Sequence, residues 1–383
     1  MPTLSYFLAT LRHPIDDKHA LWNQPLPADR RGTASAEPGV PEGEILTYGG
    51  YFSAVARFCS HSGWRNILRV TTDKLQQPLT VDHIAGASIF LEKHGALYHP
   101  ARVEVTVAGQ RFNLVVNVAS SPAGKAALVR ETRALAHLNE HRPFGWFPSV
   151  FAVTAEPPPM FLGDWFDDYH EFHLTRTSRR DELGLVLWDG AAKRCLLSKN
   201  QAAALYRNMA MILTACYDPV STRQIFPWHH AAGDFVVRLR KGRVSVKLIT
   251  VRGYTPLTND AARPADENEL LESLLLFFLH LSVRMRLDRL DGVSDVAWAP
   301  DSCLVPTVDG FFQGLDLAAR MSGFPEAFPQ IFQQYLRHQR AGDLESIAAQ
   351  LIHTVFDGHS EEIRVIESVL AAHIKAVFAR LTA

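Results

Sequence analysis

Two histidines and an aspartate stand close together in the segment 226–254, FPWHHAAGDFVVRLRKGRVSVKLITVRGY. His229, His230 and Asp234 precede two apolar runs that are separated by Lys241-Gly242, a pattern typical of a hairpin. Rigid strands beside such a cluster would hold several titratable groups at one place. Because imidazole titrates near neutral pH and also binds metals, these residues favour proton transfer or metal binding.

The same residues also have a purely structural interpretation. Both histidines can be loop residues bonded to the backbone, with Asp234 capping a turn after Gly233. A metal site would need a third or fourth ligand, and His170 and His173 are the candidates elsewhere in the chain. If the cluster has a chemical role, His229 and Asp234 are the candidate catalytic residues and Asp234 is the candidate metal ligand.

Other candidate ligand-binding residues lie earlier in the chain. His94 belongs to LEKHGALYHP, residues 91–100, where a glycine-bearing hairpin would cover a ligand's phosphates; a plain turn between strands is the alternative. Asn117 and Glu131 can form a polar pair, or Glu131 can be a solvated residue beside two arginines. The acidic run at 164–168 suits a cation or a basic partner, or is a solvated loop.

Composition limits the classes of partner. The 383 residues include 39 basic and 40 acidic side chains, so neither nucleic acid nor an anionic membrane is predicted as a partner. The four cysteines form no CxxC pair, which is typical of a reducing compartment, and the N-terminus lacks the pattern of a secretory signal. The apolar segment 270–283 contains Glu272 and His280 and is too short to cross a bilayer. We expect a cytoplasmic protein.

The elements that must position the candidate residues are predicted in three blocks. Residues 1–78 are expected to form a helical extension, with one helix suggested by the apolar residues at 4, 7, 8 and 11, and a flexible Pro- and Gly-rich linker at 27–45. Residues 79–166 are expected to form three strands, a helix that begins at Ser121-Pro122, and two further strands. Residues 167–383 are expected to be mostly helical around the hairpin of 226–254. Ser198 is the expected cap of a helix that ends near residue 217, and further helices are expected near 266–289, 307–321, 326–340, 342–356 and 360–382.

This order of elements resembles the protein-kinase-like fold, and within it the aminoglycoside phosphotransferases and related small-molecule kinases. The likeness covers roughly residues 84–383 and concerns layout more than motif. It implies an α+β, bilobal protein with a small antiparallel-sheet N-lobe and a mostly helical C-lobe. No Walker A, GxGxxG, HExxH or serine-hydrolase motif is present.

The resemblance assigns a role to particular positions. The family's third strand carries a lysine for the nucleotide phosphates, where this chain has Asn117, and the following helix carries a glutamate, matched by Glu131. Asp234 stands where the family has a metal-binding asparagine, and counting back five residues places His229 at the catalytic aspartate. Thr250 falls at the second metal-binding aspartate.

Three charged groups of the phosphotransfer site are thus replaced, unless the alignment slips. Phosphoryl transfer relies on metal ions and cationic groups that neutralise charge in the transition state. We therefore expect a catalytically degenerate, pseudokinase-like protein that binds a ligand or a partner in the interlobe cleft. One alternative is an unconventional phosphotransferase that uses His229 and Asp234 with ATP and magnesium. Another is a protein-interaction scaffold with a vestigial cleft.

Overall fold

The computed structural model describes residues 2–9, 11, 13–27, 46–95, 97–177, 182–189, 193–230, 233–257, 266–322 and 324–382. The linker predicted at 27–45 lies outside these residues apart from Pro27. The fold is α+β, as predicted. The chain forms two compact units: the first comprises Met1–His137 and Pro148–Asp167, and the second comprises Leu138–Phe147 and Asp168–Ala383.

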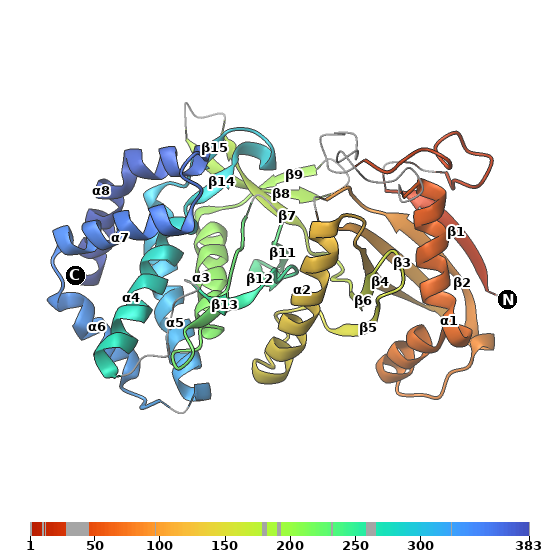
Figure 1. The fold of residues 1–383 in the computed structure, drawn as a ribbon, viewed down its shortest axis with the longest axis horizontal. Coiled ribbons are helices and arrows are strands. Elements are labelled where there is room, and N and C mark those ends of the chain that lie inside the picture. The colour runs from red at the N-terminus through yellow and green to blue at the C-terminus, as the bar shows by residue number, and fades with distance from the viewer. Residues whose placement is uncertain are drawn as a thin grey trace. The chain divides into compact units, whose positions relative to one another are not determined.

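A six-stranded mixed sheet forms the centre of the first unit (Figure 1). Its strand order is β1-β2-β3-β4-β6-β5, in which β1 runs parallel to β2 and the other neighbours are antiparallel. The strands are β1 (Thr3–Leu8), β2 (Ile84–Leu91), β3 (His99–Val107), β4 (Gln110–Val118), β5 (Val150–Thr154) and β6 (Met160–Asp164). The five strands expected between residues 84 and 166 are all present.

The helix expected near residues 4–11 was a wrong prediction, because Thr3–Leu8 is strand β1. Leu4 and Leu8 lie four residues apart, a spacing that suits a helix. Leu4, Tyr6 and Leu8 also alternate with period two, and all three pack against the core of the sheet. Pairing with β2 resolves this ambiguity in favour of the strand.

Two helices complete the first unit. Helix α1 (Tyr48–Leu75), which is interrupted by non-helical dihedral angles at 61–64, shares one hydrophobic core with the strands. Helix α2 (Pro122–His141) begins as predicted, since the Gly124 amide donates to Ser121 Oγ at 3.0 Å. A short 3-10 helix, η2 (Val81–His83), leads into β2.

The second unit contains short sheets and a group of helices. A three-stranded meander comprises β7 (Glu171–Arg176), β8 (Leu183–Asp189) and β9 (Lys193–Leu196). The hairpin expected within 226–254 is present as β11 (Phe235–Arg240) and β12 (Arg243–Leu248), joined by Lys241-Gly242. Two further pairs are β10 (Arg223–Ile225) with β13 (Tyr254–Pro256), and β14 (Leu287–Arg289) with β15 (Val296–Trp298).

The helices expected in the second unit are also present. Helix α3 begins after its predicted cap, Ser198, which accepts from the Gln201 amide, and it packs beside α5 (Figure 1). The helices are α3 (Lys199–Ala215), α4 (Glu267–Arg284), α5 (Leu304–Ser322), α6 (Phe328–His338), α7 (Ala341–Val355) and α8 (Glu361–Thr382), with 3-10 helices η3 (Leu290–Gly292) and η4 (Asp301–Cys303). Helix α4 is shorter than predicted, because the chain turns into β14.

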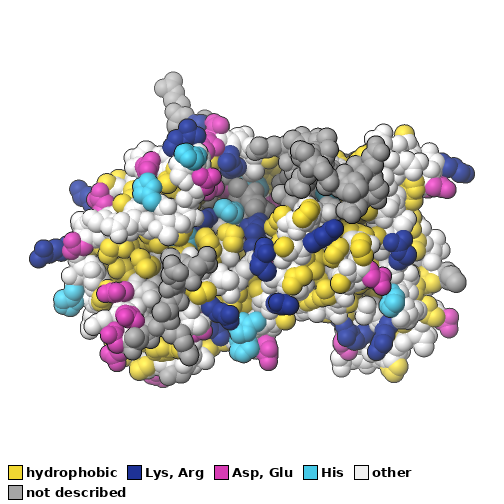
Figure 2. All heavy atoms as spheres, viewed as in Figure 1, with side chains coloured by type: hydrophobic (Ala, Val, Ile, Leu, Met, Phe, Trp, Pro, Cys, Tyr) yellow, Lys and Arg dark blue, Asp and Glu magenta, His cyan; other side chains and the backbone are white. Residues whose placement is uncertain are grey.

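The surface carries both signs of charge, as the nearly equal numbers of acidic and basic residues predict. Acidic and basic side chains are interspersed over the face drawn in Figure 2. Within the described parts of the chain, no helix combines the length and the hydropathy that a membrane crossing requires.

Candidate functional site

Asp234 is held at the start of the hairpin of the second unit. It immediately precedes β11, is fully buried, and its backbone carbonyl accepts a hydrogen bond from the Ile249 amide at 2.7 Å, just beyond β12. Gly233, at φ +66°, provides the left-handed turn before it. The hairpin therefore fixes the backbone of this residue.

The carboxylate of Asp234 is bound by Arg252. Arg252 Nη2 donates to Oδ1 at 2.6 Å, and Nη1 donates to Oδ2, which forms a bidentate ion pair. The Asp234 side chain is 1% exposed and that of Arg252 is 18% exposed. Planar, charge-assisted pairs of this kind are stronger than neutral hydrogen bonds, and they occupy both carboxylate oxygens.

This ion pair bears directly on the predicted metal ligand. A permanent cation already neutralises Asp234, so a divalent ion would have to displace the guanidinium. In the described ranges, no group of three or more His, Cys, Asp or Glu side chains gathers in a way that could hold a metal ion. His170, one of the two additional ligands considered, instead forms a backbone bridge with Val237 of β11.

His229 lies beside the same carboxylate but uses its backbone there. Its amide donates to Asp234 Oδ2 at 2.8 Å, while ring atom Nδ1 is 3.4 Å from Nη1 of Arg284. Burial, together with Arg284 and Arg252, lowers the pKa of His229 to about 3. The imidazole is therefore neutral at physiological pH and a weak base.

His230 has a different environment from its neighbour. It is 3% exposed and its ring stacks on Trp228, with centroids 5.4 Å apart and an interplanar angle of 29°. The rings of Phe172 and Tyr206 lie next to it. Burial lowers the pKa of His230 to about 4, so this side chain is also neutral near pH 7.

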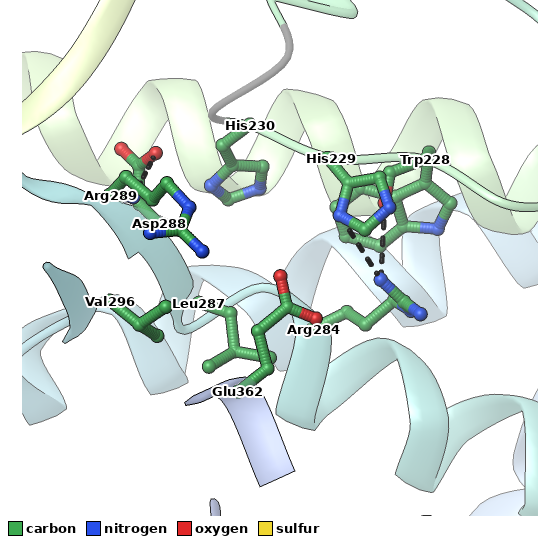
Figure 3. Close-up of a pocket in the computed structure, with 9 residues that line it drawn as sticks. All are labelled: Trp228, His229, His230, Arg284, Leu287, Asp288, Arg289, Val296 and Glu362. Atoms are coloured by element: carbon green, nitrogen blue, oxygen red, sulfur yellow. Dashed lines mark hydrogen bonds between the residues drawn. The ribbon is translucent and has the colours of Figure 1, made fainter. Parts of the chain in front are cut away.

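A hollow in the second unit is formed where this segment faces α4, α8 and the β14–β15 pair (Figure 3). It contains about 290 Å³ of non-protein space, part of it open to solvent. Because this figure includes open solvent, the enclosed part of the hollow is smaller and suits only a small chemical group. Its lining residues are Trp228, His229, His230, Arg284, Leu287, Asp288, Arg289, Val296 and Glu362.

A buried group of charges supports the wall of the hollow. His173 Nδ1 lies 3.5 Å from Asp288 Oδ1, and its Nε2 lies 3.8 Å from Glu171 Oε2. Burial lowers the pKa of His173, but the contacts with the two carboxylates outweigh this effect and raise it to about 9. A Cβ atom on Gly233 or Gly292 would approach Glu171 or His173, respectively, to within 2.7 Å.

The other predicted residue of the second unit, Thr250, follows β12 and is half-buried. The functionally placed residues that the sequence did not indicate are Arg252, Arg284, Asp288 and Glu362. Arg252 lies two residues beyond Thr250, and the ion pair with Asp234 requires the chain to turn back after β12. The residues VRGY (251–254) show no spacing pattern from which this turn could be predicted.

Three predicted ligand-binding residues belong to the first unit. Asn117 lies on β4 opposite Phe161 of β6, and Glu131 lies on α2. Glu131 is 1% exposed, which contradicts its interpretation as a solvated residue. The acidic run behaves as a solvated turn at Asp167 and Asp168, which are exposed.

His94 is part of a polar chain within the first unit. Its Nε2 is 3.3 Å from Tyr48 Oη, and its Nδ1 is 3.3 Å from Nδ1 of His99. His99 Nε2 in turn lies 3.0 Å from Ser120 Oγ. Burial lowers the pKa of both imidazoles, that of His99 to about 4 with a contribution from His94.

No family profile matches the chain, and no curated protein matches it.

Proposed function

We propose that this chain is a kinase-like protein of bilobal organisation that has lost ordinary phosphoryl transfer and acts by binding a ligand. The observation that carries the proposal is the bidentate ion pair between Arg252 and Asp234. At the position where the kinase resemblance expects a metal-binding side chain, an arginine neutralises the carboxylate. The positive charge that neutralises this buried carboxylate is therefore supplied by the protein.

The electrostatics of the other matched positions support the same conclusion. Asn117 and Thr250 are uncharged, so neither replaces the lysine or the aspartate that the resemblance assigns to those positions. Metal ions and cationic groups carry most of the stabilisation of a phosphoryl-transfer transition state. Removing one such preorganised partner commonly costs about 3–4 kcal/mol.

His229 is poorly suited to replace the family's catalytic base. A general base works best when its pKa lies near the working pH. The arginines around His229 and its burial lower the pKa to about 3, and Nδ1 faces the Arg284 guanidinium. The geometry thus favours binding over the alternative of an unconventional phosphotransferase that uses His229 and Asp234.

A turnover assay tests the proposal. Purified protein with ATP and magnesium should release or transfer no phosphate above a protein-free control, and His229→Ala and Asp234→Asn should leave that background unchanged. Circular dichroism establishes that each variant is folded. Turnover in the wild-type protein that both substitutions abolish would overturn the proposal in favour of the phosphotransferase.

A further inference from the structure

Arg284 is a buried cation without a close carboxylate among the described residues. It is 6% exposed at the end of α4, and no Asp or Glu oxygen of the described chain lies within 4.0 Å of its guanidinium nitrogens. Burying an unpaired charge is costly, so buried arginines are normally matched by an acid. Arg286, two residues later, is matched in this way by Asp301 at 2.6 Å.

The contacts that Arg284 does make leave part of its donor capacity unused. Nε donates to His280 Nε2 at 2.8 Å, and Nη1 lies 3.4 Å from the Trp228 carbonyl oxygen. The guanidinium carbon is 4.4 Å from the centroid of the Phe356 ring. A guanidinium carries five N–H donors. The donors of Nη2 find no hydrogen-bond acceptor in the part of the protein described.

A second polar group in the hollow also lacks a hydrogen-bond partner among the described residues. Nε2 of His230 is buried and makes no hydrogen bond within the described chain, and the whole residue is only 3% exposed. Figure 3 shows the ring nitrogens of His230 directed toward the interior of the hollow. Because buried polar atoms are normally hydrogen-bonded, this atom marks a place for a ligand atom or a water molecule.

Glu362 supplies the opposite charge. It enters the hollow from the first turn of α8 (Figure 3) and forms no ion pair within 4.0 Å with any described residue. The other carboxylates of this region are already bound: Glu361 contacts Arg289 at 3.2 Å, and Asp288 accepts from the Leu174 amide at 2.8 Å. Arg284 and Glu362 therefore form a separated pair of opposite charges.

The charges and size of the hollow define one ligand class. We propose that it binds the zwitterionic head group of an α-amino acid or a compound with the same head group. The ligand carboxylate would accept from Arg284, and its ammonium would donate to Glu362, with His230 Nε2 as a further polar contact. The apolar wall of Trp228, Leu287 and Val296 would contact the carbon atoms.

This inference rests on the proposed binding function and assigns the class of ligand. The probes are glycine and the standard L-α-amino acids, with acetate and methylammonium as controls that each carry one of the two charges. Binding is measured by calorimetry and by the shift in melting temperature at matched concentrations. At least one zwitterion should bind, whereas acetate and methylammonium should bind about tenfold more weakly or not at all, as expected from the loss of one charged hydrogen bond.

Variants separate a ligand role of the two charges from a structural one. Arg284→Lys, which keeps the charge, and Glu362→Gln should each weaken zwitterion binding about tenfold or more. Arg286→Lys and Glu367→Gln, the latter at an exposed residue of α8 outside the hollow, are matched controls that should leave the affinity unchanged. Glu362 is partly exposed, so Glu362→Gln keeps the test informative if the Arg284 variant fails to fold.

Two results would overturn the inference. One is the absence of binding by every amino acid tested; the other is acetate binding as tightly as a zwitterion with no effect of Glu362→Gln, which would indicate a simple anion site. Neither result affects the turnover assay. Phosphate transfer from ATP would instead contradict the proposed function, whether or not an amino acid binds.

Discussion

Arg252 Nη1 and Nη2 donate to the two carboxylate oxygens of Asp234, at the position where the kinase resemblance expects a side chain that binds a metal ion. The pair is nearly removed from solvent on the aspartate side. A guanidinium is charged at all physiological pH values and matches a carboxylate in plane. The hairpin of β11 and β12 is therefore closed at its base by a salt bridge between two of the protein's own side chains.

Removal of the arginine should destabilise the second unit. In Arg252→Ala the Asp234 charge stays buried without its partner, so the free energy of unfolding should fall by about 3 kcal/mol or more. Arg252→Lys should recover part of the loss, because an ammonium cannot bind both oxygens in the same way. Urea denaturation measures both changes. The exposed pair Arg320–Asp316 is the control, and Arg320→Ala should cost less than about 1 kcal/mol.

The glycines beside the buried charges should not tolerate a side chain. Gly233 and Gly292 have φ angles of +66° and +74°, and a Cβ atom would meet Glu171 Oε1 at 2.6 Å or His173 Nε2 at 2.7 Å. Each alanine variant should lose more stability in urea denaturation than Gly242→Ala. Gly242 has φ +78°, but a Cβ atom there would meet nothing within 4 Å, so its variant measures the dihedral cost alone, about 1 kcal/mol. Equal losses at all three positions would contradict the packing.

Stability should depend on His173 at alkaline pH. Its pKa is raised to about 9 in the folded protein from 6.5, so its charged form stabilises the fold fully below pH 6.5, and the contribution is lost as pH rises toward 9. His173→Gln should remove this part of the pH dependence. The measurement is the urea midpoint between pH 6 and pH 10, values chosen to span about the two pKa values. An unchanged profile in the variant would show that His173 is not charged in the fold.

His99 should act in the opposite direction. Its pKa falls to about 4 in the folded first unit, so unfolding takes up a proton, and stability is lost as pH decreases from about 6.5 toward 4. The loss is on the order of 3 kcal/mol, and His99→Gln should flatten it while keeping a polar group near Ser120. Chemical denaturation across this pH range provides the test. The same acid sensitivity in the variant would assign it to other groups.

Local patterns were sufficient to predict strands β2 to β6, the β11–β12 hairpin and the main helices, but not the short strands β7 to β10 and β13 to β15. Ser121 and Ser198 were predictable as helix caps because each is a short polar residue directly before a helical pattern of apolar residues. Both accept the expected capping hydrogen bond. The alternation of polar and apolar residues at 102–107 likewise indicated strand β3, and the Lys241-Gly242 turn indicated the β11–β12 hairpin. Strand β1 was missed because the spacing of Leu4, Tyr6 and Leu8 becomes decisive only when β2 lies alongside.

The candidate site was predictable only in part. Asp234 and His229 were found from their spacing, and both lie at the base of the hairpin. Their chemistry depends on two arginines from later segments of the chain. Arg252 neutralises the Asp234 carboxylate, and Arg284, together with burial, lowers the pKa of His229. Such long-range pairs leave no periodic signal in the chain. The charge environment that decides the function could be obtained only from the fold.

The most direct test of the account is the melting temperature of the wild-type protein with ATP, measured with and without magnesium. Because Arg252 occupies both oxygens of Asp234, magnesium should add no stabilisation to that produced by ATP alone. A magnesium control without nucleotide corrects for nonspecific effects of the ion. A large additional rise in melting temperature that requires ATP and magnesium together would show a working metal–nucleotide site and would contradict the central claim.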